Sequence, residues 1–159
     1  MKVVILYGSK SDVEFAEPAR ALLRELGVRF EERVASAHKT PDRLLEMLAE
    51  YERSGEELVY LTVVGRSNAL SGMVDARVRH PVIACPVRME SFPFDIFSSL
   101  RMPRGVAPLV VADPEGAALA AAKILSLADR ELGERVSRWQ ERRREEVLSA
   151  DGEARKGWR

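Results

Sequence analysis

The sequence predicts one α/β domain in which a parallel sheet lies between two layers of helices. Five apolar runs rich in β-branched residues alternate with stretches of helical spacing, an order of elements typical of this class. Several of these runs are almost continuously apolar, as expected for strands buried on both faces in a parallel sheet covered by helices. A chain of 159 residues has the length of one ordinary domain.

Five strands are expected. In chain order they are residues 3–7, 28–34, 58–64, 81–85 and 106–112. The first, third and fifth are nearly continuous apolar runs and should therefore be buried on both faces. Right-handed crossovers leave few ways to connect parallel strands, and of these we expect the flavodoxin-like order. The expected architecture is a three-layer αβα fold with a flavodoxin-like, parallel five-stranded sheet.

The first two helices have recognisable start signals. Ser11 and Glu14 fit a capping box, so the first helix should begin at Ser11 and end at Gly27. Thr40 before Pro41 has the order of an N-cap followed by proline at the first helical position. This pair should start a second helix that ends at about residue 54.

The later helices are expected to differ in character. Short helices should cover residues 68–77 and 94–100, and the Asp113-Pro114 pair should open a longer one. From Glu134 onward a few apolar residues lie among many charges, which indicates an amphipathic helix that protrudes from the domain. The expected organisation is a flavodoxin-like domain and a C-terminal helical extension with a polar tail: residues 1–132 and 133–159.

The composition argues against several classes of protein. The 25 basic and 25 acidic side chains give a formal net charge of zero, whereas a nucleic-acid-binding protein shows a basic excess. No apolar run approaches the ~18 residues of a membrane span, and the N-terminal run ends at Gly8, too soon for a signal peptide. The single cysteine, Cys85, suits a reducing compartment, and with two histidines it excludes a Cys/His structural zinc site. We therefore expect a cytoplasmic protein with no nucleic-acid, membrane or metal partner.

Polar loops follow the first three strands, at the edge where open parallel sheets bind ligands. After the first strand, Gly8 is followed by Ser9, Ser11 and Asp12 at an expected helix start, whose free N–H groups suit a phosphate. This loop lacks the dinucleotide-binding and Walker patterns. Taken alone, it fits a simple helix cap as well as a binding site.

The other two loops add groups that can do chemistry. After the second strand, Ser36 is followed by His38, which can exchange protons near neutral pH, and by Lys39, which can meet an anion. A solvated loop histidine is the ordinary alternative. The third strand is followed by a glycine, a hydroxyl and an amide: Gly65, Ser67 and Asn68. Three such loops at one edge together predict a pocket for a small, polar, phosphorylated ligand.

Two other reactive side chains are expected to be structural. His80 precedes a strand and so lies at the amino-terminal ends of the strands, away from the predicted pocket at their carboxyl ends. Cys85 lies in an apolar strand and should pack as a small buried hydrophobic residue.

The same three loops resemble, in order, those of the phosphoribosylaminoimidazole carboxylases of purine biosynthesis. The motifs are G-S-x-S-D at 8–12, S-A-H-K at 36–39 and G-R-S-N-A-L at 65–70, and further similar stretches carry the resemblance over about residues 3–127. It implies carboxylation of 5-aminoimidazole ribonucleotide with CO2 to 4-carboxy-5-aminoimidazole ribonucleotide on the de novo route to IMP. The family's chemistry needs no metal, biotin, ATP or other cofactor.

Two alternatives to direct carboxylation stay open. The family also has a mutase branch, which acts on N5-carboxyaminoimidazole ribonucleotide. Lys39 and the G-R-S-N loop resemble the direct carboxylases, whereas Thr40-Pro41 is more like the mutases. A non-catalytic flavodoxin-like module that binds a phosphate ligand, such as a flavin, would have similar phosphate loops, although it would not require His38.

The resemblance and the chemistry together imply a role for each loop residue. His38 would take the ring proton as general base, and Lys39 would compensate the phosphate or the new carboxylate. The other expected substrate contacts are Ser9 and Ser11 for the phosphate, Asp12 for the ribose, Ser36, Gly65 and Ser67 for the carboxyl end, and Asn68.

The resemblance also implies a homo-oligomer, either a tetramer or an octamer. The segment after Glu134 has too few apolar residues to form a core layer, yet such a helix is stable mainly when its apolar stripe meets something. A neighbouring subunit is the expected partner for that stripe: Val136, Trp139, Val147 and Leu148. The loop over residues 87–93, which includes Phe92, is a second candidate for a subunit contact.

Overall fold

A parallel five-stranded sheet with the strand order β2-β1-β3-β4-β5 forms the centre of the molecule. The structure is a computed structural model that describes residues 1–91 and 93–156. The strands, all paired in parallel, are β1 (Lys2–Tyr7), β2 (Phe30–Val34), β3 (Leu58–Val64), β4 (Val82–Pro86) and β5 (Leu109–Val110). The order 2-1-3-4-5 confirms the flavodoxin-like prediction.

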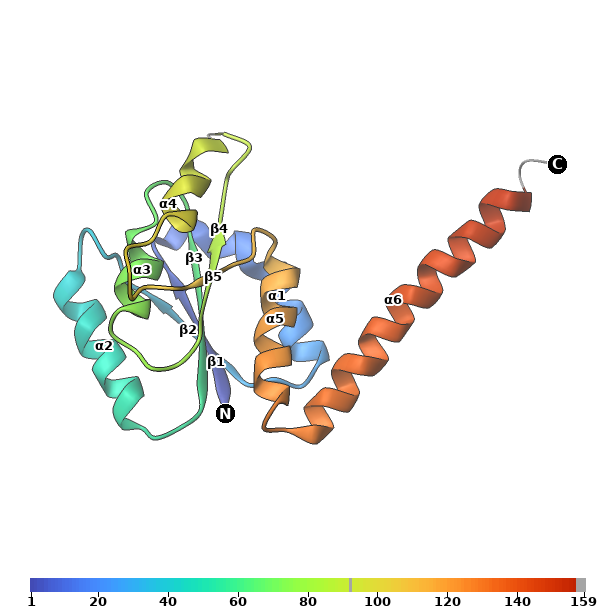
Figure 1. The fold of residues 1–159 in the computed structure, drawn as a ribbon, viewed down its shortest axis with the longest axis horizontal. Helices are drawn as coiled ribbons and strands as arrows, with labels where there is room; N and C mark the ends of the chain where they lie inside the picture. The colour runs from blue at the N-terminus through green and yellow to red at the C-terminus, as the bar shows by residue number, and fades with distance from the viewer. Residues whose placement is uncertain (92, 157–159) are drawn as a thin grey trace.

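Helices cover both faces of the sheet (Figure 1). One face packs against α1 (Glu17–Glu25), α5 (Pro114–Ser126) and the start of α6 (Arg130–Lys156), and the other against α2 (Pro41–Arg53) and α3 (Ala69–Asp75). The short α4 (Phe97–Leu100), preceded by the 3-10 turn η3 (Pro93–Ile96), lies near the carboxyl ends of the strands.

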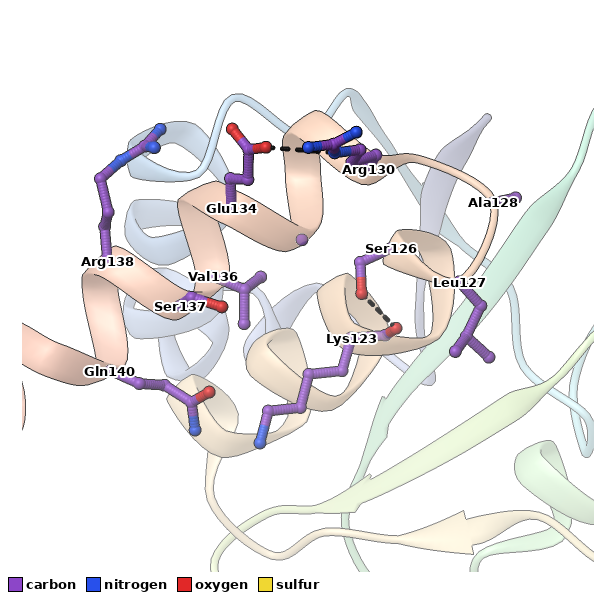
Figure 2. Close-up of a pocket in the computed structure, with 11 residues that line it drawn as sticks. Lys123, Ser126, Leu127, Ala128, Arg130, Glu134, Val136, Ser137, Arg138 and Gln140 are labelled. Carbon is purple, nitrogen blue, oxygen red and sulfur yellow. Dashed lines mark hydrogen bonds and ion pairs between the residues drawn. The ribbon is translucent and has the colours of Figure 1, made fainter.

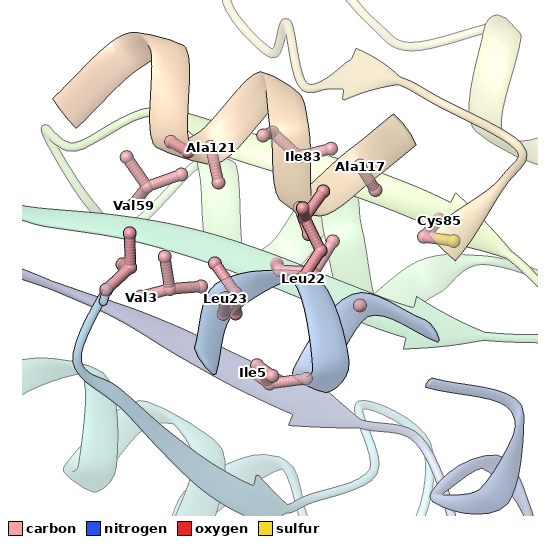
Figure 3. Packing of buried hydrophobic residues seen from close by; sticks show 14 of the residues in the cluster. Val3, Ile5, Leu22, Leu23, Val59, Ile83, Cys85, Ala117 and Ala121 are labelled. Atoms are coloured by element: carbon pink, nitrogen blue, oxygen red, sulfur yellow. The ribbon is translucent and has the colours of Figure 1, made fainter. Parts of the chain in front are cut away.

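The core consists of two clusters because successive residues of a strand point to opposite faces. Val3 and Ile5 of β1 face the cluster under α1 and α5, whereas Val4 and Leu6 face the cluster under α2 and α3. Figure 3 shows Val3, Ile5 and their neighbours on β3 and β4 against leucines of α1 and alanines of α5. Buried alanines along α5 bring that helix close to the sheet. The carboxyl ends of β1, β3 and β4 are thereby held together at one edge.

Two predictions about local structure are wrong. No helix begins at Ser11: two 3-10 turns, η1 (Lys10–Asp12) and η2 (Glu14–Ala16), precede α1, and Ser11 bonds Ser9 instead of capping a helix. The fifth strand is two residues long and partly exposed rather than long and buried. It lies at the edge of the sheet beside β4, and Pro108 just before it has no N–H for the ladder.

The C-terminal helix both packs and protrudes. α6 begins at Arg130, earlier than expected, so the expected boundary after residue 132 lies inside it. Its first half is anchored in the core by Leu132, Val136 and Trp139, and the remainder extends away from the domain (Figure 1). The expectation that a neighbouring subunit covers Val136 and Trp139 is therefore wrong, because the chain's own core buries both side chains. In the part of the chain that the structure describes, no helix is long and apolar enough to cross a membrane. Phe92, which was predicted to contact a neighbouring subunit, lies outside the described residues.

Candidate active site

A cavity of about 570 Å³ lies at the carboxyl-end edge of the sheet, between the loops that follow β1, β2, β3 and β4. Its volume is ordinary for a site that binds a small molecule. Its walls are Gly8, Ser9, Ser11, Asp12, Ser36, Ala37, His38, Lys39, Val64, Gly65, Arg66, Ser67, Leu70 and Arg88. The structure thus brings together every residue that the sequence predicted for the site, with the exception of Asn68.

The turn after β1 is held by hydrogen bonds among its own side chains. Ser9 Oγ donates to Asp12 Oδ2 at 3.0 Å. A hydroxyl has one hydrogen, so Ser11 Oγ must donate to Ser9 Oγ across their 2.6 Å contact. Asp12 is only 4% exposed. Because α1 begins at Glu17, any phosphate bound here would meet this polar turn rather than the N-terminus of that helix.

Gly8 lets this turn approach β3 closely. A Cβ atom at Gly8 would lie 2.6 Å from Val64 Cγ2, well inside van der Waals contact. A Gly8→Ala variant should therefore push the turn away from β3 and lose about 1–3 kcal/mol of unfolding free energy. Urea denaturation measures this loss. Gly152→Ala is the matched control, because its Cβ would meet nothing within 4 Å. Equal stability of Gly8→Ala and wild type would contradict the predicted clash.

The loop after β2 closes on itself and presents two side chains to the cavity. Ser36 Oγ accepts from the Lys39 backbone N–H at 3.2 Å, and Thr40 Oγ1 accepts from the Ser36 N–H at 3.0 Å. Thr40 therefore fastens this loop and makes no side-chain hydrogen bond as N-cap of α2. Among the described residues, neither the His38 ring nor the Lys39 ammonium has a protein partner, and both residues are exposed. Both groups are available to a ligand.

The loop after β3 contributes Gly65, Arg66 and Ser67 to the cavity, whereas the side chain of Asn68 is buried elsewhere. Asn68 Oδ1 caps α3 by accepting from the Ser71 N–H at 3.1 Å, and Asn68 Nδ2 donates to Ser99 Oγ at 2.8 Å. The geometry therefore does not support a direct substrate contact by this amide. Asn68 instead ties the loop to α3 and α4.

Two arginines complete the walls of the cavity without having been predicted as site residues. Arg66 and Arg88 have φ values of 56° and 59°, and they are the two non-glycine residues with positive φ in the described ranges. Backbone strain of this kind is concentrated at functional sites. Arg66 belongs to a recognised motif, but Arg88 follows β4 in a loop with no motif. Only the position of Arg88, just after the carboxyl end of β4, could have marked it in the sequence as a site residue.

His80 and Cys85 lie in structural surroundings. His80 Nδ1 is 2.7 Å from Glu52 Oε1, which also accepts from the Tyr60 hydroxyl at 3.1 Å. This cluster lies where β4 begins, away from the cavity. Cys85 is fully buried, and burial, with a smaller effect of Asp113, raises the pKa of its thiol to about 12. Cys85 is therefore a protonated thiol at neutral pH and no nucleophile.

A larger and more open hollow of about 950 Å³ lies between the end of α5 and the start of α6 (Figure 2). Its walls include Val136 and the ion pair between Arg130 Nε and Glu134 Oε1 at 3.4 Å. It contains no histidine and lies at the end of α5 remote from the loops described above. Size alone therefore does not identify the site, and the smaller cavity holds the groups that can do chemistry.

Comparison with known proteins gives a consistent result. The model of the family AIR carboxylase matches residues 2–146. A phosphoribosylaminoimidazole carboxylase of Archaeoglobus fulgidus is 50% identical over 98% of this chain and 86% of its own length. The crystal structure of Treponema denticola PurE has a TM-score of 0.91 at 43% identity, covering 95% of this chain and 96% of that one. In Drosophila melanogaster, a bifunctional phosphoribosylaminoimidazole carboxylase/phosphoribosylaminoimidazole succinocarboxamide synthetase is 43% identical over 80% of this chain and 30% of that protein.

Proposed function

This chain belongs to the AIR carboxylase family, and from that premise we propose that it adds CO2 directly to 5-aminoimidazole ribonucleotide. The observation that carries the proposal is the placement of His38 and Lys39. Both are free of described protein partners and line one cavity with the hydroxyl-rich turn Ser9–Asp12. A proton acceptor, a cation and a polar anchoring turn are the groups that this reaction needs.

The proposed reaction has two steps. The ring carbon of the substrate behaves as an enamine carbon and attacks CO2, so that a carbon–carbon bond forms while one C–O π bond opens to a carboxylate. The same ring carbon then loses its proton to His38, and the electron pair of the C–H bond returns to the ring. His38 acts as general base in the second step, and its imidazolium passes the proton to solvent. No oxidant or reductant is consumed.

The charges around the cavity suit a substrate that is anionic at both ends. The described walls carry three cationic side chains, Lys39, Arg66 and Arg88, against one carboxylate, Asp12. A phosphate monoester enters with negative charge, and the reaction creates a second anionic group. Ser36, Gly65 and Ser67 border the part of the cavity near His38's loop and β3, where hydroxyl and backbone donors can stabilise the new carboxylate.

Direct carboxylation is favoured over the mutase reaction on two grounds. The motif carries Lys39 next to His38, the combination that resembles direct carboxylases. The relatives reported above from Archaeoglobus and Drosophila are both named carboxylases.

The test incubates the purified protein with 5-aminoimidazole ribonucleotide and bicarbonate, without ATP. Formation of 4-carboxy-5-aminoimidazole ribonucleotide is the expected result. Turnover of N5-carboxyaminoimidazole ribonucleotide alone would instead support the mutase. A non-catalytic module would turn over neither compound, and one that binds a flavin would purify as a yellow protein.

We also propose that the enzyme is a homo-oligomer of at least four subunits that works in a reducing cytoplasm. The free thiol of Cys85 suits that compartment. The outer half of α6 supports the oligomer, because Val147 and Leu148 are 70% and 65% exposed on a segment that leaves the domain (Figure 1). We propose that a second copy of this chain covers Val147 and Leu148.

Light scattering at micromolar concentration should give a mass of four or eight chains. Val147→Glu/Leu148→Glu should lower that mass, because charge would replace the apolar contact between subunits. Glu145→Gln/Glu146→Gln on the same turns of α6 is the control. A mass of one chain with full carboxylase activity would contradict the oligomer and any sharing of the site between subunits.

A further inference from the structure

Arg88 joins the loop after β4 to the turn after β1. Its Nη2 atom donates to the backbone carbonyl of Ser11 at 2.6 Å and lies 3.5 Å from Asp12 Oδ1. These partners are 77 and 76 positions away in the sequence, so the contact depends on the fold. Arg88 also lines the cavity that holds His38.

The carboxylate of Asp12 creates an electrostatic problem for the proposed function. It is nearly buried, it accepts from Ser9, and it lies in the turn proposed to receive the phosphate of the substrate. An uncompensated carboxylate would repel a phosphate dianion, and the repulsion is strong where little water screens it. Phosphate binding at this turn therefore requires a cation that touches the turn itself.

Arg88 is the cation that meets this requirement. Of the described cationic side chains around the cavity, Lys39 and Arg66 belong to other loops, and neither forms a hydrogen bond or ion pair with residues 9–12. The left-handed backbone of Arg88, at φ 59°, is a conformation that persists when surrounding contacts enforce it. The bonds to Ser11 and Asp12 are such contacts.

We propose that Arg88 is a specificity residue that enables the Ser9–Asp12 turn to accept a phosphate monoester. Its Nη2 offsets the charge of Asp12 and holds the turn through the carbonyl of Ser11. The guanidinium has five N–H donors, and those on Nε and Nη1 have no acceptor among the described residues, so they can reach the phosphate oxygens. The proposal rests on the proposed function, because that function supplies the phosphorylated substrate.

The test uses inorganic phosphate as the probe, because it lacks the ribose that Asp12 is proposed to contact. Binding is measured by calorimetry on the whole protein. Arg88→Met should weaken phosphate binding by roughly 10- to 150-fold, the loss typical of one charge-assisted contact, with Arg88→Lys in between. The KM for 5-aminoimidazole ribonucleotide should rise in parallel while kcat changes little. Arg104→Met, an exposed arginine outside the cavity walls, is the control and should match the wild type.

A second substitution separates charge compensation from a general structural effect. If Arg88 offsets Asp12, adding Asp12→Asn to Arg88→Met should restore much of the lost phosphate affinity. A double variant that binds as weakly as Arg88→Met would overturn the compensation, and phosphate binding that is absent in the wild type or unchanged in Arg88→Met would overturn the proposal. If the wild type carboxylates its substrate but Arg88→Met binds phosphate as tightly as the wild type, this inference is wrong and the proposed function stands. If Arg88→Met binds phosphate more weakly but the wild type does not carboxylate its substrate, the proposed function is wrong and this inference stands.

Discussion

A His38→Asn variant should fold like the wild type and lose about 100- to 10,000-fold in turnover, the usual contribution of a general acid–base group. His38 is exposed, and its ring has no described protein partner, so the substitution removes no core packing and no internal hydrogen bond. What it removes is the one imidazole among the cavity walls, and asparagine cannot accept the ring proton near neutral pH.

The second histidine of the chain provides the control for this experiment. His80 lies just before the amino-terminal end of β4, and its Nδ1 forms a hydrogen bond with Glu52. His80→Asn should therefore alter stability and leave turnover near the wild-type value. Steady-state rates at saturating substrate and thermal melts on all three proteins separate the two effects. If His38→Asn keeps more than half of the wild-type rate, His38 is not the proton carrier.

A Lys39→Ala variant should bind the substrate roughly 10- to 150-fold more weakly, which corresponds to a charge-assisted contact of about 1.5–3 kcal/mol. The ammonium of Lys39 has no acceptor among the described residues, so its charge is free for the ligand. We expect the loss to be smaller for the dephosphorylated nucleoside, because the phosphate is the main anion present before reaction.

Lys10→Ala is the matched control for Lys39→Ala. Lys10 is also exposed and lies in the turn after β1, but it does not line the cavity, so its removal should change affinity little. Dissociation constants for the ribonucleotide and the nucleoside are measured for both variants. Equal losses for the two ligands would contradict a contact between Lys39 and the phosphate.

The sequence predicted the centre of the fold well because the signal there is local. β3 covers the predicted residues 58–64, since a continuous apolar run is enough to identify a strand buried on both faces. Helix starts with a proline were equally clear, as at Pro41 and Pro114. The prediction failed at Leu109, where the strand lies at the edge of the sheet and half of the side chain is exposed. Whether a strand is central or at the edge of a sheet depends on the tertiary fold, and a run of apolar residues does not predict it.

The site was predicted to a similar extent and for similar reasons. The rule that ligands bind beyond the carboxyl ends of parallel strands placed Ser9, Ser36 and Gly65 around one cavity. The sequence did not reveal where the Asn68 amide points, because its partner Ser99 lies 31 residues away. It also did not reveal Arg88, whose contacts with the turn after β1 exist only in the folded chain.

The most direct test of the proposed reaction follows label from carbon-13 bicarbonate into the product. The wild-type protein is incubated with 5-aminoimidazole ribonucleotide and labelled bicarbonate in the absence of ATP, with His38→Asn in parallel. Direct carboxylation predicts that the wild type forms 4-carboxy-5-aminoimidazole ribonucleotide with the label in its new carboxylate, and that the variant forms at least about 100-fold less per unit time. Unlabelled product, or no product from a folded wild-type protein, would contradict direct carboxylation by this site.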